Sequence, residues 1–334
     1  MKKKLVAVLM TALLVCGLAA CGNKGDNTQD QGSTNAASAA KNAKYKVGVC
    51  QLVQHQSLDA ATEGFQAALK DAFGDDVAFD VQNAQNDSAT CSTIVNSFIS
   101  NQYDLILANA TPALQAAAAG TSEIPILGTS VTEYGVALEI DDFNGLIGGN
   151  VSGTSDLAPL DKQAELIKEL CPDAKKVGLL YCSAEANSQY QVDTMKGLLE
   201  KMGYSCEYYA FSDSNDLSSV VTTAAGASDV IYVPTDNTVA SNAGIIDNIC
   251  LPAKVPVIGG DKGICSGCGT VTIAVDYYDI GYKTGEMAAK ILKGEANISE
   301  MPVAYSENIT MIYNPTNVDA LGIQVPEEAV AIEK

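Results

Sequence analysis

The chain has 334 residues, of which 47% are hydrophobic and 18% are charged, and its formal net charge at pH 7 is −20. Such an acidic protein is not expected to bind nucleic acid or an anionic lipid surface. The chain contains no arginine. The carboxylate of any ligand would therefore be held by backbone N–H groups, hydroxyls or lysine rather than by a guanidinium group.

The first 20 residues have the three parts of a secretory signal peptide: three lysines, an apolar run over residues 5–18, and small residues. The run is shorter than the about 20 residues that a membrane-spanning helix needs. The segment Leu18-Ala19-Ala20-Cys21-Gly22 resembles a bacterial lipoprotein box, which implies cleavage before Cys21 and diacylglycerol on its sulfur. The alternative is an ordinary signal peptide followed by an unrelated cysteine.

With two acyl chains the mature protein is expected to be anchored on the outer face of the cell membrane. Residues 23–44 are rich in Gly, Asn, Gln, Ser, Ala and Asp and contain no aromatic residue. A segment of this composition cannot build a core and predicts a flexible tether.

The remaining residues, near 290 in number, contain an internal repeat. Residues 46–49, 104–112 and 124–128 are matched in the same order by residues 176–179, 229–238 and 255–259. Three paired segments in one order predict two similar α/β lobes, each with a buried parallel sheet. We expect lobe one to comprise residues 45–150 with about 276–306, and lobe two residues 151–275 with about 307–334. Residues 145–155 have the composition of a hinge loop, and three crossings in all are predicted.

Polar turns follow the predicted strands in both lobes, and ligands of open α/β sheets bind beyond the carboxyl ends of the strands. We therefore expect a cleft where these turns face each other. The turn at Gln54 to Ser57 places His55 at a strand-to-helix junction, where it either lines the cleft or is an exposed loop histidine. Ser57 is expected to cap the helix that follows. The other candidates from these turns are Asn109, Thr111, Thr129, Ser130, Asn187, Ser188, Asp236, Asn237 and Asp261.

Eight of the ten cysteines remain after Cys16 is removed with the signal and Cys21 is lipidated. Six are dispersed among apolar segments, which favours reduced, buried thiols over disulfides. Cys265-Ser-Gly-Cys268 could be a redox pair, a local disulfide or half of a zinc site. Because the chain has one histidine and no second C-x-x-C, we expect a turn there, with or without a local disulfide, and neither a metal nor a cofactor.

Several motifs together resemble the ABC transporter substrate-binding protein family that includes tryptophan-binding lipoproteins. They are His55-x-x-Leu-Asp59, Gly64-Phe65, Thr111-Pro112-Ala113, Thr129 to Thr132, Glu185 to Ser188, Asp236-Asn237-Thr238, Asp276-Tyr277-Tyr278-x-x-Gly281-x-x-Thr284-Gly285 and Leu321-Gly322-Ile323. The resemblance covers residues 45 to about 326. It implies a type I periplasmic-binding fold with three crossovers, and a monomer that delivers a small molecule, often an aromatic or apolar amino acid, to an ABC permease.

The resemblance implies that Asp236 contacts the amine of the ligand, and related sugar binders have an aspartate at the edge of the cleft where Asp261 lies. From the predicted turns we hypothesise the positions of all the groups of an α-amino acid. The ammonium group of an amino acid would lie near Asp236 or Asp261, and its carboxylate near Thr129, Ser130, Asn187 or Ser188. Its side chain would point toward Leu58 and Tyr277. The alternative is structural: Thr111, Ser188 and Asp236 would only cap helices, and Tyr277 would belong to the core.

The sequence argues against two other functions. The sequence lacks the G-x-S-x-G, H-E-x-x-H and P-loop motifs and has a single histidine, so an enzyme such as a secreted hydrolase is not expected. The same fold could also bind a sugar or a nucleoside. The absence of tryptophan and the low aromatic content, 6%, argue against a sugar site.

Overall fold

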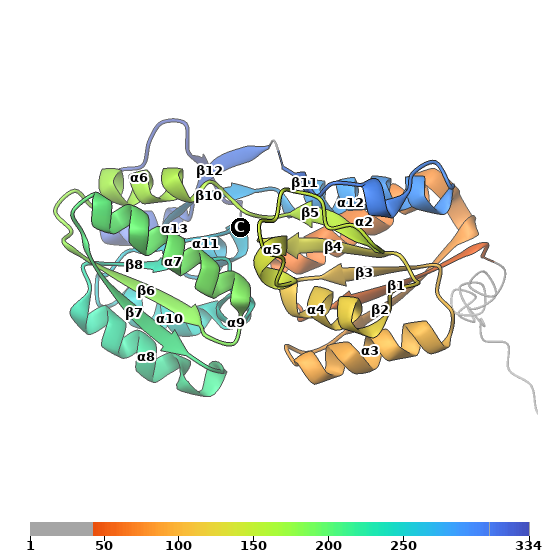
Figure 1. The fold of residues 1–334 in the computed structure, drawn as a ribbon. Helices are drawn as coiled ribbons and strands as arrows, with labels where there is room; N and C mark the ends of the chain where they lie inside the picture. Colours follow the sequence, from red (N-terminus) through yellow and green to blue (C-terminus); the bar gives the residue numbers. More distant parts are fainter. Residues whose placement is uncertain (1–42, 307, 334) are drawn as a thin grey trace, which may run out of the picture.

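The computed structural model describes residues 43–306 and 308–333, which form two α/β lobes lying side by side (Figure 1). The predicted signal peptide, Cys21 and most of the tether lie outside the described residues. Each lobe is a mainly parallel sheet with helices on both faces, which confirms the predicted duplicated fold. No helix within the described residues is both long enough and apolar enough to span a membrane.

Lobe one is built on a sheet of six strands whose neighbours are all parallel. Its central strands consist of apolar residues and are buried along their whole length, as expected for strands covered on both faces. In spatial order the strands are β11 (Ala304–Tyr305), β5 (Val151–Ser155), β4 (Ile126–Val131), β3 (Leu105–Asn109), β1 (Tyr45–Gln51) and β2 (Val77–Asn83).

Four helices cover this sheet, two on each face. Helices α3 (Ser88–Ser100) and α4 (Thr111–Gly120) share one apolar core with the sheet, and α2 (Gln56–Phe73) and α12 (Tyr277–Leu292) share the other. Helices α2 and α12 approach closely at glycines, since a Cβ atom on Gly281 would lie 2.0 Å from the carbonyl oxygen of Ala61. The remaining helical segments of this lobe are α5 (Tyr134–Ala137), η1 (Gly74–Asp76) and η2 (Ile298–Glu300).

Lobe two is built on a sheet of seven strands, in which only the β10–β12 pair is antiparallel. In spatial order the strands are β13 (Val330–Ala331), β12 (Ile309–Tyr313), β10 (Val271–Val275), β9 (Val257–Gly259), β8 (Val230–Val233), β6 (Lys176–Cys182) and β7 (Ser205–Phe211). Two apolar cores lie on the two faces of this sheet. The helices are α6 (Leu160–Leu170), α7 (Ala186–Lys201), α8 (Ser214–Ala227), α9 (Asn237–Ser241), α10 (Ala243–Cys250), α11 (Lys262–Gly267) and α13 (Pro315–Leu321).

The chain passes between the lobes three times: after β5, between β10 and α12, and between β11 and β12 (Figure 1). The sequence assigned residues 151–155 to lobe two, whereas β5 pairs with β4 inside the sheet of lobe one. The polar composition of this segment suggested a loop. The polar residues can nevertheless be buried in a strand because they have hydrogen-bond partners inside the protein. The hydroxyl of Thr154, for example, lies 2.7 Å from that of Thr284 on α12.

All eight cysteines of the described residues are free thiols, and seven of them are buried. Cys265 lies in the short helix α11 and Cys268 in the turn that ends it, and both thiols are buried. Burial raises the pKa of both thiols, so neither is an activated thiolate.

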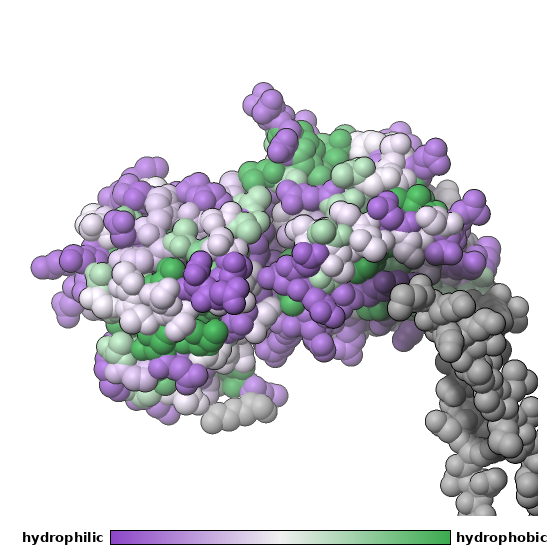
Figure 2. All heavy atoms as spheres, turned by 90° about the horizontal axis from the view of Figure 1, so that it is seen from below, coloured by the Kyte–Doolittle hydropathy of each residue, from purple (hydrophilic) through white to green (hydrophobic). Residues whose placement is uncertain are grey.

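Figure 2 shows the molecule from below, where hydrophilic residues alternate with smaller hydrophobic patches on both lobes.

Candidate functional site

The two lobes contact each other through three side-chain hydrogen bonds. The His55 Nε2 atom lies 3.2 Å from Asn237 Oδ1, the Ser57 hydroxyl donates to Asp261 Oδ1 at 3.2 Å, and the Asn86 amide donates to Thr238 Oγ1 at 2.9 Å. The predicted role of Ser57 as an N-cap is therefore wrong, since His55 occupies the N-cap position of α2 and the Ser57 side chain bonds lobe two.

Six buried side-chain atoms of the described residues have no hydrogen-bond partner in the protein, and all lie in segments that follow strands or at strand ends. They are His55 Nδ1, Asn109 Oδ1, Thr111 Oγ1, Ser130 Oγ, Asp156 Oδ1 and Asn187 Oδ1. Leaving a buried polar group without a partner costs about 1–3 kcal/mol. A cluster of such groups between two lobes indicates a site where a polar ligand supplies the partners.

Two strand ends of lobe one combine these groups with an unusual backbone. Ala110 follows β3 with φ 96°, and Ser130, the last residue but one of β4, has φ 55°. Residues other than glycine rarely adopt these backbone conformations, which cluster at functional sites. Ala110 is also the N-cap of α4, and its side chain offers that helix no cap. The free N–H groups of the first turn and the Thr111 hydroxyl can therefore bind an anion together.

The corresponding acidic turn of lobe two is already occupied by internal bonds. Asp236 accepts from the N–H groups of Cys182 and Val239, at 2.7 and 2.9 Å. Glu185 accepts four bonds from the backbone and side chains of Asn237 and Thr238, at 2.7–3.0 Å. Burial, followed by the nearby Glu185, raises the pKa of Asp236 well above its ordinary value.

Asp261 holds its own turn and the contact between the lobes. Its Oδ1 atom accepts from the N–H of Ile264 at 3.0 Å and from the Ser57 hydroxyl. Burial raises the pKa of Asp261, and the nearby His55 opposes this effect.

Asp156 is a residue of the site that the sequence analysis missed. It directly follows β5 and is 2% exposed; the hydroxyl of Tyr277 donates to its Oδ2 atom at 2.7 Å, while Oδ1 has no partner. Burial raises the pKa of Asp156 to about 6, although the bond from Tyr277 opposes this shift. The only signal in the sequence was an acidic residue immediately after the hinge-like segment 145–155.

The four buried acidic side chains of the described residues, Asp156, Glu185, Asp236 and Asp261, all lie in segments that follow strands. Among the described residues no lysine is buried, and the single ion pair, Lys196 with Glu200, lies elsewhere in lobe two. A buried carboxylate is costly without a compensating charge. The charge distribution of the site therefore suits a ligand that carries a cationic group.

The other predicted site residues have different surroundings. Leu58 belongs to the apolar core beneath the cleft, and Gln54 is exposed. The Thr129 hydroxyl is paired with that of Thr154 at 3.2 Å, and the Ser188 hydroxyl with the Thr235 carbonyl at 3.4 Å. Asn187 lies beside Ser188 at the start of α7 and uses only its NH2 group, which donates to the Thr235 carbonyl at 3.0 Å.

A cavity of about 260 Å³ opens between the lobes at the outer strands of both sheets. Its apolar lining includes Leu52 and Pro112 from lobe one and Ala184 from lobe two, and polar side chains complete it. Pro112 follows Thr111 in the chain, so the cavity adjoins the N-terminus of α4. No group of three potential metal-binding side chains was found in the part of the chain that the structure describes.

Comparisons with known proteins agree with this geometry. A tyrosine-binding protein of Clostridioides difficile (strain R20291) is 36% identical over 330 residues, which cover 96% of this chain and 93% of the relative. The crystal structure of an ABC domain in complex with L-Trp from Streptococcus pneumonia is 33% identical, with a TM-score of 0.82, and covers 87% of this chain and 100% of that one.

A third relative differs in its state. The ligand-free, open structure of a substrate binding protein with adhesive properties from Clostridium difficile is 39% identical, covering 86% of this chain and 99% of that one, yet its TM-score is only 0.67. The overall structure of this chain is thus more similar to the complex with L-Trp than to this ligand-free structure.

The family model described as "ABC transporter substrate binding protein" matches residues 46–333. That match spans both lobes and the cleft between them, and the chain belongs to the family of ABC transporter substrate binding proteins.

Proposed function

We propose that this protein captures a free aromatic α-amino acid between its lobes and delivers it to the permease of an ABC importer. The observation that carries this proposal is the set of unpartnered buried groups at the strand ends. It contains hydroxyl donors beside a free helix N-terminus, which suit a carboxylate, and acceptors in an acidic environment, which suit an ammonium group. An α-amino acid carries both groups on one carbon atom.

The carboxylate is assigned to the start of α4. The Thr111 hydroxyl and the unused N–H groups of the first turn form one side of this subsite, and the Ser130 hydroxyl from the neighbouring strand β4 forms the other. This arrangement requires no arginine, which the chain lacks. Hydrogen bonds to a charged group contribute about 1.5–3 kcal/mol each.

The side chain of the ligand is assigned to the adjoining cavity. Its volume of about 260 Å³ lies below the roughly 300–1,000 Å³ of pockets that hold drug-sized ligands. The cavity therefore favours a solute of the size of an amino acid. Two relatives are described with tyrosine and tryptophan, which supports an aromatic side chain here.

The role in transport also requires a position outside the cytoplasm. The predicted signal peptide and the lipid anchor at Cys21 support attachment of a monomeric receptor to the outer face of the membrane, with residues 23–44 as the tether.

Isothermal titration of the purified chain lacking residues 1–21 tests the proposed ligand. We expect tyrosine or tryptophan to bind, and we expect analogues that lack the carboxylate, tyramine and tryptamine, to bind at least about tenfold more weakly, because one charged hydrogen bond contributes about 1.5 kcal/mol or more. Binding of a sugar or a nucleoside, with no response to any amino acid, would contradict the proposal.

A further inference from the structure

Asp156 lies where the cleft meets the hinge. It is the first residue after β5, in the first crossing between the lobes, and its N–H donates to the carbonyl of Val131 at 3.3 Å. That bond places Asp156 beside the end of β4, which carries Ser130. The side chain is 2% exposed, and its two oxygen atoms differ: Oδ2 accepts from Tyr277, whereas Oδ1 is buried without a partner.

We propose that Asp156 binds the ammonium group of the ligand through Oδ1 and thereby makes the receptor specific for solutes that carry an amine. This inference rests on the proposed function and adds a named residue to it. An ammonium group has three N–H donors and no acceptor. Asn187 Oδ1, another buried oxygen without a partner, is a second acceptor available in the cleft.

The alternatives to Asp156 are less suitable because their oxygen atoms already accept hydrogen bonds, both atoms in Asp236 and the Oδ1 atom in Asp261. Both oxygens of Asp236 accept backbone N–H groups that fix the start of α9 and the end of β6. Asp261 caps α11 and accepts the Ser57 hydroxyl across the cleft, both through Oδ1, so this carboxyl group is held in place by both lobes. Asp156 is the carboxyl group of the cleft wall that combines nearly complete burial with an unpartnered oxygen atom within the described residues.

The position of Asp156 connects amine binding to the hinge. Tyr277, which donates to Oδ2, is the first residue of α12 and follows the second crossing. Asp156, on the first crossing, thus accepts a hydrogen bond from Tyr277, next to the second crossing, through Oδ2. Its Oδ1 atom remains available to the ligand. An ammonium group bound at Oδ1 would be in place only when both crossings adopt the observed arrangement, which stabilises the closed form of the receptor.

The surroundings of Asp156 also predict that ligand binding releases a proton. The groups that face it are the hydroxyls of Tyr277 and Thr132, the carboxyl group of Asp261 and, further away, the phenol of Tyr134. None of them is a cation. Burial raises the pKa of Asp156 to about 6, so the carboxyl is largely neutral below pH 6. A bound ammonium group favours the charged form and lowers this pKa again.

The sign of the pH dependence follows directly. Above pH 7 Asp156 is already ionised before binding, so affinity is at its plateau. Below pH 6 the carboxyl must lose a proton when the amine binds, so affinity falls by up to tenfold for each pH unit until the pKa of the complex is reached. Between pH 7 and pH 5 we expect a loss of about tenfold in affinity.

Calorimetry of the unaltered protein provides the first test. Titration of tyrosine or tryptophan at pH 6, in two buffers with different enthalpies of ionisation, measures the number of protons released. We expect about half a proton at pH 6 and close to none at pH 8. The His55→Gln variant, which leaves Asp156 unchanged, should keep the proton release.

Variants provide the second test. We expect Asp156→Asn to reduce affinity at pH 8 by at least about thirtyfold, because a buried charge pair loses 2 kcal/mol or more when one partner is removed, and to abolish proton release at pH 6. Asp161→Asn, an exposed acidic residue five positions further on in α6, is the matched control and should behave like the wild type. Tyr277→Phe removes the bond that lowers the pKa of Asp156, so the midpoint of the pH dependence should move upward.

The outcomes separate the two proposals. If no amino acid binds at any pH, the proposed function fails. If amino acids bind without proton release, and Asp156→Asn binds them as tightly as the wild type, only the role of Asp156 is overturned. Should Asp156→Asn not fold, the proton count of the wild-type protein still decides the question, since it requires no variant.

Discussion

The two lobes share one architecture but use the carboxyl ends of their strands differently. In lobe one, the hydroxyls of Thr111 and Ser130 have no partner in the protein. Ser130 itself has a positive φ, and Thr111 follows Ala110, which also has one. In lobe two, the acidic turn at Asp236 and Glu185 is filled by internal hydrogen bonds. We infer that lobe one and the hinge supply most of the recognition, whereas lobe two supplies a fixed wall against which they close.

The contrast shows why the type of a residue in a cleft does not establish its role. From the sequence, Asp236 is a stronger candidate for a ligand-binding carboxylate than Asp156, because it lies in a polar turn after a buried strand. Its two oxygen atoms are nevertheless committed to backbone N–H groups, and its effect on a ligand would be indirect. Asp156 follows a segment that looks like a plain loop, yet it keeps a free oxygen.

The largest expected effect follows from removing Asp236. Asp236→Ala leaves the N–H groups of Cys182 and Val239 buried without partners, each at a cost of about 1–3 kcal/mol, so we expect unfolding in urea to show a loss of about 3 kcal/mol. Asp87→Ala is the matched control, since Asp87 caps α3 through the N–H group three residues further on, as Asp236 caps α9, but at the surface, and it should cost about 1 kcal/mol.

This experiment can overturn the comparison between the lobes. If Asp236→Ala abolished ligand binding and left the free energy of unfolding unchanged, lobe two would contribute direct recognition after all.

A smaller and opposite effect is expected in lobe one. Thr111→Val removes a hydroxyl that has no partner in the protein, so the stability of the ligand-free chain should not fall. The affinity for the amino acid should fall about tenfold or more, because a hydrogen bond to a charged group contributes about 1.5–3 kcal/mol. Titration calorimetry and urea unfolding of one preparation give both quantities.

Thr129→Val serves as the control for this variant. Thr129 is buried in the same strand as Ser130, but its hydroxyl is paired with Thr154. It should lose about 1 kcal/mol of stability and little affinity. Equal losses of affinity in both variants would remove the distinction between free and occupied hydroxyls on which the site is based.

Much of the fold could be predicted from the sequence because buried parallel strands consist of continuous runs of apolar residues. The runs at residues 104–108 and 229–233 begin one residue before the strands β3 and β8 and fix the two halves of the repeat. The topology of parallel sheets then places the ends of these strands at one edge. The segment 151–155 was misread because its Ser, Gly and Thr residues are typical of loops, and only packing against α12 makes them a strand.

The roles of the individual site residues could not be predicted, because they depend on contacts between residues that are distant in the sequence. The hydroxyl that holds Asp156 belongs to Tyr277, 121 residues away, and the donors that occupy Glu185 are more than 50 residues away. Sequence patterns name the residues at a strand end but do not state which of their atoms are already bonded. Ser57 is an example, since its place before an apolar run indicated a cap and its hydroxyl instead reaches lobe two.

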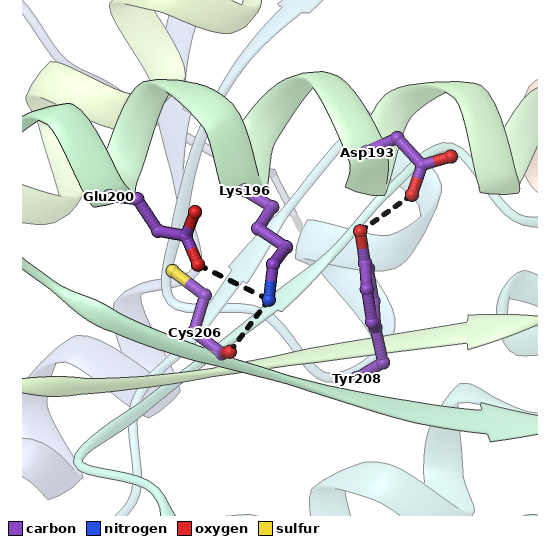
Figure 3. Close-up of polar contacts among 5 residues, drawn as sticks. All are labelled: Asp193, Lys196, Glu200, Cys206 and Tyr208. Carbon is purple, nitrogen blue, oxygen red and sulfur yellow. Dashed lines mark hydrogen bonds and ion pairs between the residues drawn. The ribbon is translucent and has the colours of Figure 1, made fainter.

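The smallest expected effect concerns the outer edges of the two sheets, which also differ. Each edge has a tyrosine that donates to an aspartate: Tyr103 to Asp80 at 2.8 Å in lobe one, and Tyr208 to Asp193 at 2.6 Å in lobe two. In lobe two, a lysine also lies over the ring of the tyrosine. Figure 3 shows Lys196 between α7 and β7, where its Nζ atom donates to the Cys206 carbonyl at 3.1 Å.

Lys196 also pairs with Glu200 at 3.2 Å and lies 4.7 Å from the centre of the Tyr208 ring. Both side chains of the ion pair are partly exposed, and such contacts contribute a few tenths of a kcal/mol each. We therefore expect Lys196→Met, which keeps the apolar stem, to lower the free energy of unfolding by about 1 kcal/mol or less. Ligand affinity should not change, because this edge lies away from the cleft. A loss of affinity in this variant would mean that lobe two is not a rigid surface. The contacts at its edge would then affect how the lobes close, which we assign to lobe one and the hinge.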